Sequence, residues 1–188
     1  MHVRFSSCIG LPVVEEGDGE TIGTISGMLI HPDTGKVEGF FVHRPGLFGS
    51  DHSFLSTLDI LRWGMRVEVR TEDVLGSLED HIRLQPLLLD PRPVLGQQMR
   101  TERGVVLGRC KDVQFDTKHF LTEWLFPKKF FRWGTPLPLG SVVEVRRDAI
   151  IMRDPLQKER PTVPEQSALI PQFPEVAEAR VLRRRSSR

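Results

Sequence analysis

An internal repeat is the feature of this sequence that most constrains its fold. Residues 10–23 are echoed by residues 96–108, and in each copy two glycines bracket a polar turn. Residues 24–30 then align with residues 109–115 at a separation of 85 positions, and both segments alternate large side chains with small or polar ones. Because this alternation is typical of a half-buried strand, the sequence predicts equivalent strands in the two copies.

The alignment continues through the following strands of each copy. Residues 36–42 correspond to residues 120–126 at a separation of 84, and residues 54–69 to residues 136–151 at a separation of 82. The separation shrinks only between strands, as a duplication followed by loop deletions would produce.

The last block allows a second alignment. Placing Gly64 opposite Gly140 matches the similar strings at residues 67–69 and 143–145. We prefer the first alignment because it keeps the order of the strands.

The predicted fold class is mainly β. Short strands at intervals of about 8–12 residues, separated by Gly, Pro and Asp turns, are typical of small closed antiparallel sheets. We therefore expect two tandem small antiparallel β-barrels, over residues 5–76 and 94–156, joined by a linker over residues 77–93. The proline-rich, basic tail over residues 157–188 is predicted to be disordered.

Two short helices are expected outside the barrels. In the linker, residues 78–84 form the clearest helix candidate, with Ser77 as its N-cap and Pro86 limiting its extent. A second short helix over residues 175–182 is an option within the tail.

Charge, cysteine content and hydrophobicity limit the kind of protein this can be. The formal net charge of +1 gives no overall field that would collect polyanions. Cys8 and Cys110 are the only cysteines, without metal-ligand spacing, and are expected to be buried thiols in a reducing compartment. With no signal peptide and no stretch of about 18 apolar residues, a soluble, cytoplasmic protein is expected.

Residues 107–116 read Leu-Gly-Arg-Cys-Lys-Asp-Val-Gln-Phe-Asp. They carry nearly the complete pattern of the PRC-barrel family, which is Gly, a polar turn, Gly and then Lys-x-Asp-Val-x-Phe-Asp, so the second copy resembles that family. The family is named for the cytoplasmic part of the photosynthetic reaction centre H subunit and also occurs at the C-terminal end of a ribosome-maturation factor. The first copy departs from the family pattern, with Gly27 in place of the first Asp and His31 in place of the second.

The resemblance covers about residues 8–75 and 94–155. It implies the fold and a role in assembly or docking, because the family is not known for chemistry. Unlike the reaction-centre subunit, the chain is expected to have no membrane-spanning helix, and a second PRC copy is expected where the maturation factor has a different N-terminal domain.

Polar residues on the turns offer little support for catalysis. Asp112 and Asp116, four apart at a strand end, would suit a cation site or an acid/base pair, but are better interpreted as caps of turns. The histidines near the turns have no tight ligand spacing and are expected to be exposed: His31, His43, His52 and His119. We therefore predict no catalytic residue, no cofactor and no metal, and no enzymatic activity.

The best functional candidate is a basic, aromatic loop between two strands of the second copy. Such a loop suits base stacking, anchoring of a protein or contact with a membrane interface. The alternative is that its rings plug the open end of the barrel or form the interface between the two barrels. The predicted partner-binding residues, with three arginines of the tail, are Phe126, Lys128, Lys129, Phe130, Phe131, Arg132, Trp133, Arg183, Arg184 and Arg185.

The expected function is that of a non-catalytic adaptor or assembly module, in which a tandem PRC-barrel docks a macromolecular partner. An RNA- or ribosome-associated assembly factor is the alternative, and an accessory subunit of a membrane complex is the weaker one. A protein partner is expected, with RNA or the ribosome as the second choice, a membrane at most peripheral, and no small molecule.

Overall fold

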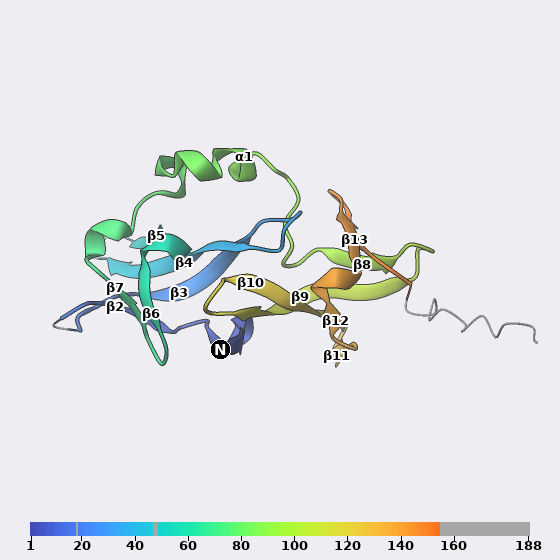
Figure 1. Ribbon diagram of the computed structural model, residues 1–188, viewed down its shortest axis with the longest axis horizontal. Helices are drawn as coiled ribbons and strands as arrows, with labels where there is room; N and C mark the ends of the chain where they lie inside the picture. Colours follow the sequence, from blue (N-terminus) through green and yellow to red (C-terminus); the bar gives the residue numbers. More distant parts are fainter. Residues whose placement is uncertain (18, 47–48, 155–188) are drawn as a thin grey trace, which may run out of the picture. The chain divides into compact units, whose positions relative to one another are not determined.

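A computed structural model describes residues 1–17, 19–46 and 49–154 of the chain. It is mainly β, as predicted, with two sheets and short helical turns (Figure 1). The strands are β1 (His2–Arg4), β2 (Pro12–Glu15), β3 (Thr21–Ile30), β4 (Val37–Gly46), β5 (Gly49–Ser56), β6 (Ile60–Trp63), β7 (Val67–Val69), β8 (Gln98–Thr101), β9 (Val106–Asp116), β10 (Leu121–Lys129), β11 (Arg132–Trp133), β12 (Leu137–Pro138), β13 (Val142–Val145) and β14 (Ala149–Met152). The helical turns are η1 (Phe5–Ser7), η2 (Thr57–Asp59), η3 (Glu72–Val74), η4 (Leu78–Asp80), η5 (Ile82–Leu84), α1 (Gln85–Leu88) and η6 (Leu139–Ser141).

The two sheets share one topology. The first sheet runs β5-β4-β3-β2-β7-β6, and the second runs β11-β10-β9-β8-β14-β13, with β1 on β9 and β12 on β10. Each sheet holds one parallel pair, β2 with β7 and β8 with β14. All the other strand pairs are antiparallel, as the predicted fold class has it, and the parallel pair arises because the last strands of each copy return beside its first strand. The shared order is what a duplication produces.

Strand register extends the repeat to single residues. Met28 pairs with Phe40 in the first sheet, and Val113 pairs with Leu125 in the second, so both strands are offset by 85 positions. The offset of 84 predicted for β4 and β10 is wrong by one. Phe120 has a φ of 52°, in the place of Gly35 with a φ of 69°, so it belongs to the turn and not to the strand.

The last block follows the preferred alignment in strand order, since β7 and β14 take the same place in their sheets. Its register differs by one residue. Val13 pairs with Val67, and Met99 pairs with Ile150, so Val67 corresponds to Ile150 and not to Ala149.

The repeated glycine at the start of β3 and β9 has a steric cause. A Cβ atom on Gly23 would lie 3.0 Å from the carbonyl oxygen of His43, and one on Gly108 would lie 2.8 Å from that of Lys128. Because these approaches leave no room for a side chain, each copy requires glycine where the hairpin strands come together.

The two copies meet around an approximate two-fold axis. The Val37 N–H donates to the carbonyl of Phe120 at 2.7 Å, and the Thr122 N–H donates to that of Gly35 at 2.9 Å. Lys36 and Leu121 form the bridge between these bonds. The two donors are 85 positions apart in the chain, and so are the two acceptors. Each hydrogen bond is therefore the equivalent of the other in the repeat.

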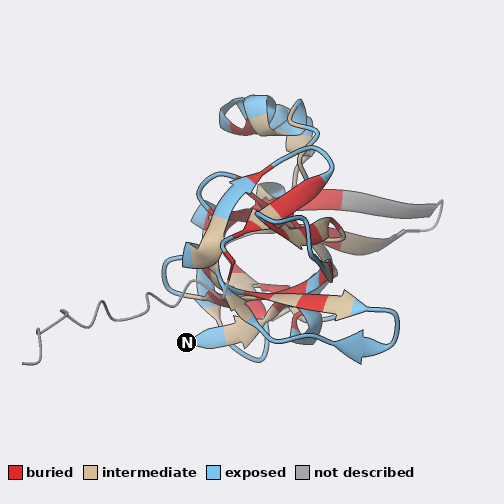
Figure 2. Cartoon of the chain, turned by 90° about the vertical axis from the view of Figure 1, so that its right-hand side faces the viewer, coloured by how far each residue is buried: buried red, intermediate tan, exposed pale blue. Residues whose placement is uncertain are grey.

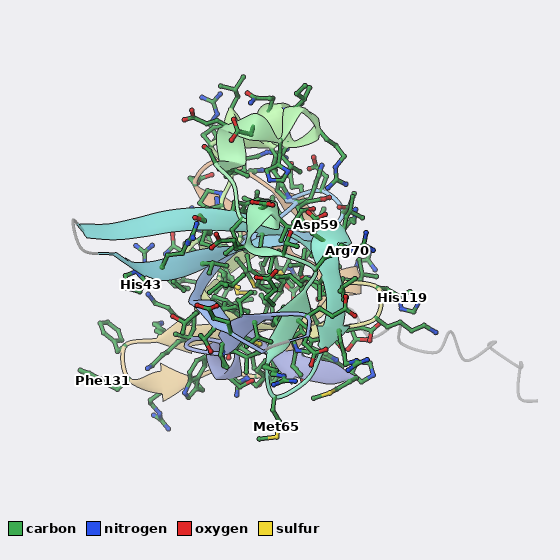
Figure 3. The ribbon with its side chains drawn as sticks, turned by 90° about the vertical axis from the view of Figure 1, so that its left-hand side faces the viewer. His43, Asp59, Met65, Arg70, His119 and Phe131 are labelled. Atoms are coloured by element: carbon green, nitrogen blue, oxygen red, sulfur yellow. The ribbon has the colours of Figure 1, made fainter. Side chains whose placement is uncertain are left out.

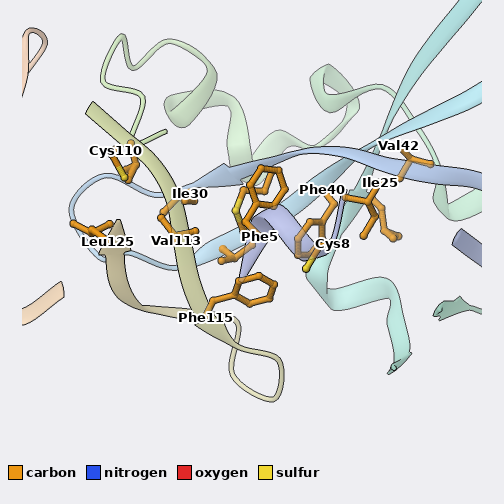
Figure 4. Packing of buried hydrophobic residues seen from close by; sticks show 14 of the residues in the cluster. Phe5, Cys8, Ile25, Ile30, Phe40, Val42, Cys110, Val113, Phe115 and Leu125 are labelled. Carbon is orange, nitrogen blue, oxygen red and sulfur yellow. The ribbon is translucent and has the colours of Figure 1, made fainter. Parts of the chain in front are cut away.

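One hydrophobic core serves both sheets (Figure 4). The ring of Phe40 lies 4.9 Å from that of Trp63 and 5.9 Å from that of Phe115, measured between centroids, and Phe120 joins the same group. In Figure 2 buried residues line the strands of both sheets, whereas the linker is mostly exposed. The two barrel-like halves therefore pack together, and residues Met1–Pro155 form one compact unit.

The linker differs from its prediction in its helix. Ser77 caps as expected, accepting the Glu79 N–H at 3.3 Å, but η4 and η5 are separate turns. Pro86 lies at the start of α1 and does not end a helix, because proline fits the first helical turn. The predicted tail, with its helix candidate and Arg183, Arg184 and Arg185, lies outside the described residues.

Candidate docking surface

The predicted basic, aromatic loop is a β-hairpin. Lys128 pairs with Trp133 and Lys129 with Arg132, which leaves Phe130 and Phe131 as a two-residue turn. The two rings are 86% and 95% exposed, and Phe131 points away from the sheet in Figure 3. These two rings therefore neither plug the end of the barrel nor form the interface between the two halves.

The backbone conformation at the tip of the hairpin is unfavourable for a phenylalanine. Phe130 has a φ of 51°, a region that two-residue hairpin turns usually fill with glycine or asparagine. An exposed phenylalanine there adds nothing to the core. Strain at such a position points to a role outside folding.

A cation stacks on the base of the hairpin. The guanidinium of Arg4 lies 4.1 Å from the ring centroid of Phe126 and 5.3 Å from that of Trp133. The Lys128 ammonium lies 5.1 Å from Trp133. These cation–π contacts hold the two predicted rings in place.

Asp112 positions Arg4. Its side chain is 1% exposed and accepts bonds from Arg4 Nε at 2.9 Å, Arg4 Nη2 at 2.8 Å and the Ser6 hydroxyl at 2.6 Å. The backbone N–H groups of Ser6 and Val113 also donate to it, both at 2.9 Å. The interpretation of Asp112 as a turn cap is wrong, because its main role is to join the N-terminal arm to the second sheet. We use the name N-terminal arm for residues 2–7, which form β1 and η1.

Asp116 does cap a turn, as predicted. It accepts the N–H groups of Lys118 at 3.2 Å and His119 at 3.1 Å. These hydrogen bonds hold the pKa of the Asp116 carboxyl well below its usual range, and the bond from the Lys118 N–H has the largest effect. Asp116 also accepts the N-terminal ammonium of Met1 at 3.3 Å, so both aspartates of β9 contact the N-terminal residues.

Beside the hairpin, an open groove of about 500 Å³ runs along the outer face of β10. Its lining consists of Gln114, Trp124, Phe126, Thr135 and Pro136. Trp124 remains 39% exposed and Trp133 52%. We call the hairpin and this groove the hairpin surface, made of Gln114, Trp124, Phe126, Lys128, Lys129, Phe130, Phe131, Arg132, Trp133, Thr135 and Pro136.

The other candidate groups do not converge. His119 bonds to Asp116, and His31 accepts the Asp33 N–H at 3.2 Å. The side chain of His52 lies outside the described residues. Among the described residues no three His, Cys, Asp or Glu side chains are grouped in a way that would hold a metal ion.

Both thiols are buried, as predicted. Burial raises the pKa of Cys8 to about 11 and that of Cys110 to about 12. Because a thiolate is the reactive form, both cysteines are neutral and unsuited to nucleophilic chemistry near pH 7.

The sequence predicted the basic, aromatic loop but missed two residues: Trp124 of this surface, and Arg4, which stacks on its Phe126. Arg4 stands far from β10 in the chain, and no local pattern marks it as a partner of Phe126. Trp124 was interpreted as an ordinary residue of a predicted strand. The bulky tryptophan at the position of Gly39 was the available signal that the two outer faces differ.

Comparison with known proteins gives a family for part of the chain. Residues 1–75 match the PRC-barrel domain. The match spans β1 and the first sheet but not residues 107–116, where the motif is most complete in the sequence. The search of curated proteins returned no match.

Within the described residues, no helix has the length and apolar character needed to cross a bilayer. PRC-barrel domains are modules of protein interaction and assembly. The chain therefore contains a PRC-barrel domain at residues 1–75, whose strands β2 to β7 form the first sheet.

Proposed function

We propose that this chain is a non-catalytic, cytoplasmic adaptor in which two PRC-like barrels present the hairpin surface to a protein partner. The shared strand order and the offset of 85 support a second PRC-like barrel over residues 94–154. The type of domain at residues 1–75 supports a role in assembly.

One observation carries the proposal. Phe130 and Phe131 are two large rings in solvent at the tip of a hairpin, and the first has a strained φ. Exposed aromatic side chains are typical anchors of protein interfaces.

The anchor is tested by affinity capture from the protein's own cell extract. The double variant Phe130→Ser/Phe131→Ser is expected to retain about 30-fold less of a specific partner than the unchanged protein, because interface aromatics often contribute 2 kcal/mol or more. Bound proteins are quantified by mass spectrometry. Met65→Ser is the matched control, since Met65 is 94% exposed on a different hairpin. Equal capture by all three proteins contradicts the proposal.

An RNA- or ribosome-associated assembly factor is the second candidate. Lys128, Lys129 and Arg132 lie beside exposed rings, and alternating cations and aromatics suit single-stranded RNA. Capture that disappears after nuclease treatment favours this candidate, whereas nuclease-resistant capture favours the adaptor. Membrane association, the third candidate, would show as co-fractionation with lipid.

The strain at the tip leads to a stability prediction. Replacing Phe130 by glycine is expected to raise the free energy of unfolding by about 1 kcal/mol, because glycine adopts a positive φ without steric cost. The melting temperature should rise by about 2–4 °C. Differential scanning calorimetry checks this, with Phe131→Gly as a control that should not stabilise. A lower melting temperature for Phe130→Gly would show that the ring supports the fold.

A further inference from the structure

The two sheets present equivalent outer faces. In the 85-position register, Phe41 of the first sheet corresponds to Phe126 of the second, and Gly39 corresponds to Trp124. Both faces therefore lie on the side of the sheet opposite the shared core.

The face of the first sheet is covered by the chain itself. The linker rises from β7 and passes over β4 and β5, with α1 above them in Figures 1 and 3. Gly76 exchanges two backbone hydrogen bonds with Phe54, and the His81 ring lies 5.2 Å from the Phe54 ring. Phe41 faces Leu78, Leu87 and Leu88 across a cavity of about 400 Å³.

The equivalent face of the second sheet has no such cover among residues 1–17, 19–46 and 49–154. In the first sheet Phe54 lies over Gly39, where any side chain would collide with its ring. In the second sheet Trp124 stands at that position, beside the groove that it shares with Phe126 and Pro136.

The charges at the groove favour an acidic occupant. Among the described residues, Lys129 and Arg132 take part in no ion pair. Two carboxylates of β9 and β10 are already engaged, Asp112 by Arg4 and Glu123 by His2. The surface is thus apolar with unneutralised cations at its edge, which carboxylates of a partner would complement.

The cover of the first sheet shows which apolar side chains such a face accepts. Leucines from its short helical turns line the cavity, and its ion pair joins Arg83 of the linker to Glu38 of β4. At the second face the unpaired charges on the sheet are cations, so the complementary carboxylates belong on the occupant. We propose that the groove along β10 binds a short segment of a partner protein that combines leucine-like side chains with neighbouring carboxylates. This inference rests on the adaptor role and adds to it the site and the chemistry of the partner.

A peptide selection tests this chemistry. The full-length protein is used to select from a display library of random 14-residue peptides. We expect enrichment of peptides that carry both Leu, Ile or Phe and Asp or Glu. Enrichment of basic peptides, or none at all, would overturn the proposal.

Variants then locate the site. Thr135→Trp fills the groove from an exposed position and should weaken binding of a selected peptide at least tenfold, as should Trp124→Ser. Lys129→Ala/Arg132→Ala should weaken it about threefold to tenfold, with the loss shrinking at high salt. Met65→Ser should bind unchanged. Unchanged melting temperatures show that the groove variants fold.

Other results count against the groove. If Thr135→Trp and Trp124→Ser both bind the selected peptides normally, the site lies elsewhere. A homodimer that Thr135→Trp dissociates, seen by sedimentation, would make a second copy of the chain the occupant. A cellular partner that is lost from Phe130→Ser/Phe131→Ser but kept by both groove variants would preserve the adaptor role and overturn the groove alone.

Discussion

Replacing Asp112 by alanine is expected to lower the free energy of unfolding by about 3 kcal/mol, because it leaves the donors of Arg4 and Ser6 without their buried acceptor. Urea unfolding followed by tryptophan fluorescence measures the loss. The Arg4 side chain is partly exposed, so in the variant water can hydrogen-bond to its guanidinium and reduce the loss of stability.

A double-mutant cycle separates the ion pair from the other bonds of Asp112. Arg4→Met, Asp112→Asn and the two combined should show a favourable coupling, since the two groups contact directly. Asp148→Ala is the control and should cost much less, because that carboxyl is 66% exposed and its ion pair with Arg100 is long, at 3.6 Å. A loss below about 1 kcal/mol for Asp112→Ala would contradict the role assigned to Asp112.

Neither half of the described chain is expected to fold alone. Separated fragments of residues 1–76 and 94–154 would expose the ring group of Phe40, Trp63, Phe115 and Phe120, which both sheets form together. Residues 94–154 would also lose β1 from the edge of β9. A chain of about 60–75 residues buries only about 60% of its unfolded surface, so such losses are not compensated.

Far-ultraviolet circular dichroism and amide proton dispersion check the fragments, each at low micromolar concentration. Both should be largely unfolded, and mixing them should restore structure, because the contacts between the halves need no covalent link. A folded, monomeric fragment of residues 1–76 would contradict the shared core.

The same interdependence affects the predicted domain boundaries. Boundaries at residues 77 and 93 follow the repeat, but β1 precedes the first sheet in the chain and pairs with the second. A repeat in sequence need not mark an independent domain, since the elements of one copy can complete the other.

The local features of this protein were readable from its sequence. Alternation of side chains and paired glycines predicted the strands, and Gly23 and Gly108 proved sterically necessary. Phe130 and Phe131, predicted on a basic, aromatic loop, lie at the exposed tip of a hairpin. Phe120 was assigned to a strand, because a bulky residue gives no local sign that it will adopt the left-handed conformation of Gly35.

By itself, then, the sequence determined a mainly β protein with a repeated set of strands and a basic, aromatic loop. Only the tertiary structure decided that Arg4 stacks on Phe126, that Asp112 secures the N-terminal arm, and that one outer face is covered and the other open. The physical reason is the distance along the chain over which the interactions act. Strand alternation and turn glycines act between near neighbours, whereas Arg4 and Asp112 meet across 108 positions through packing that no local pattern encodes.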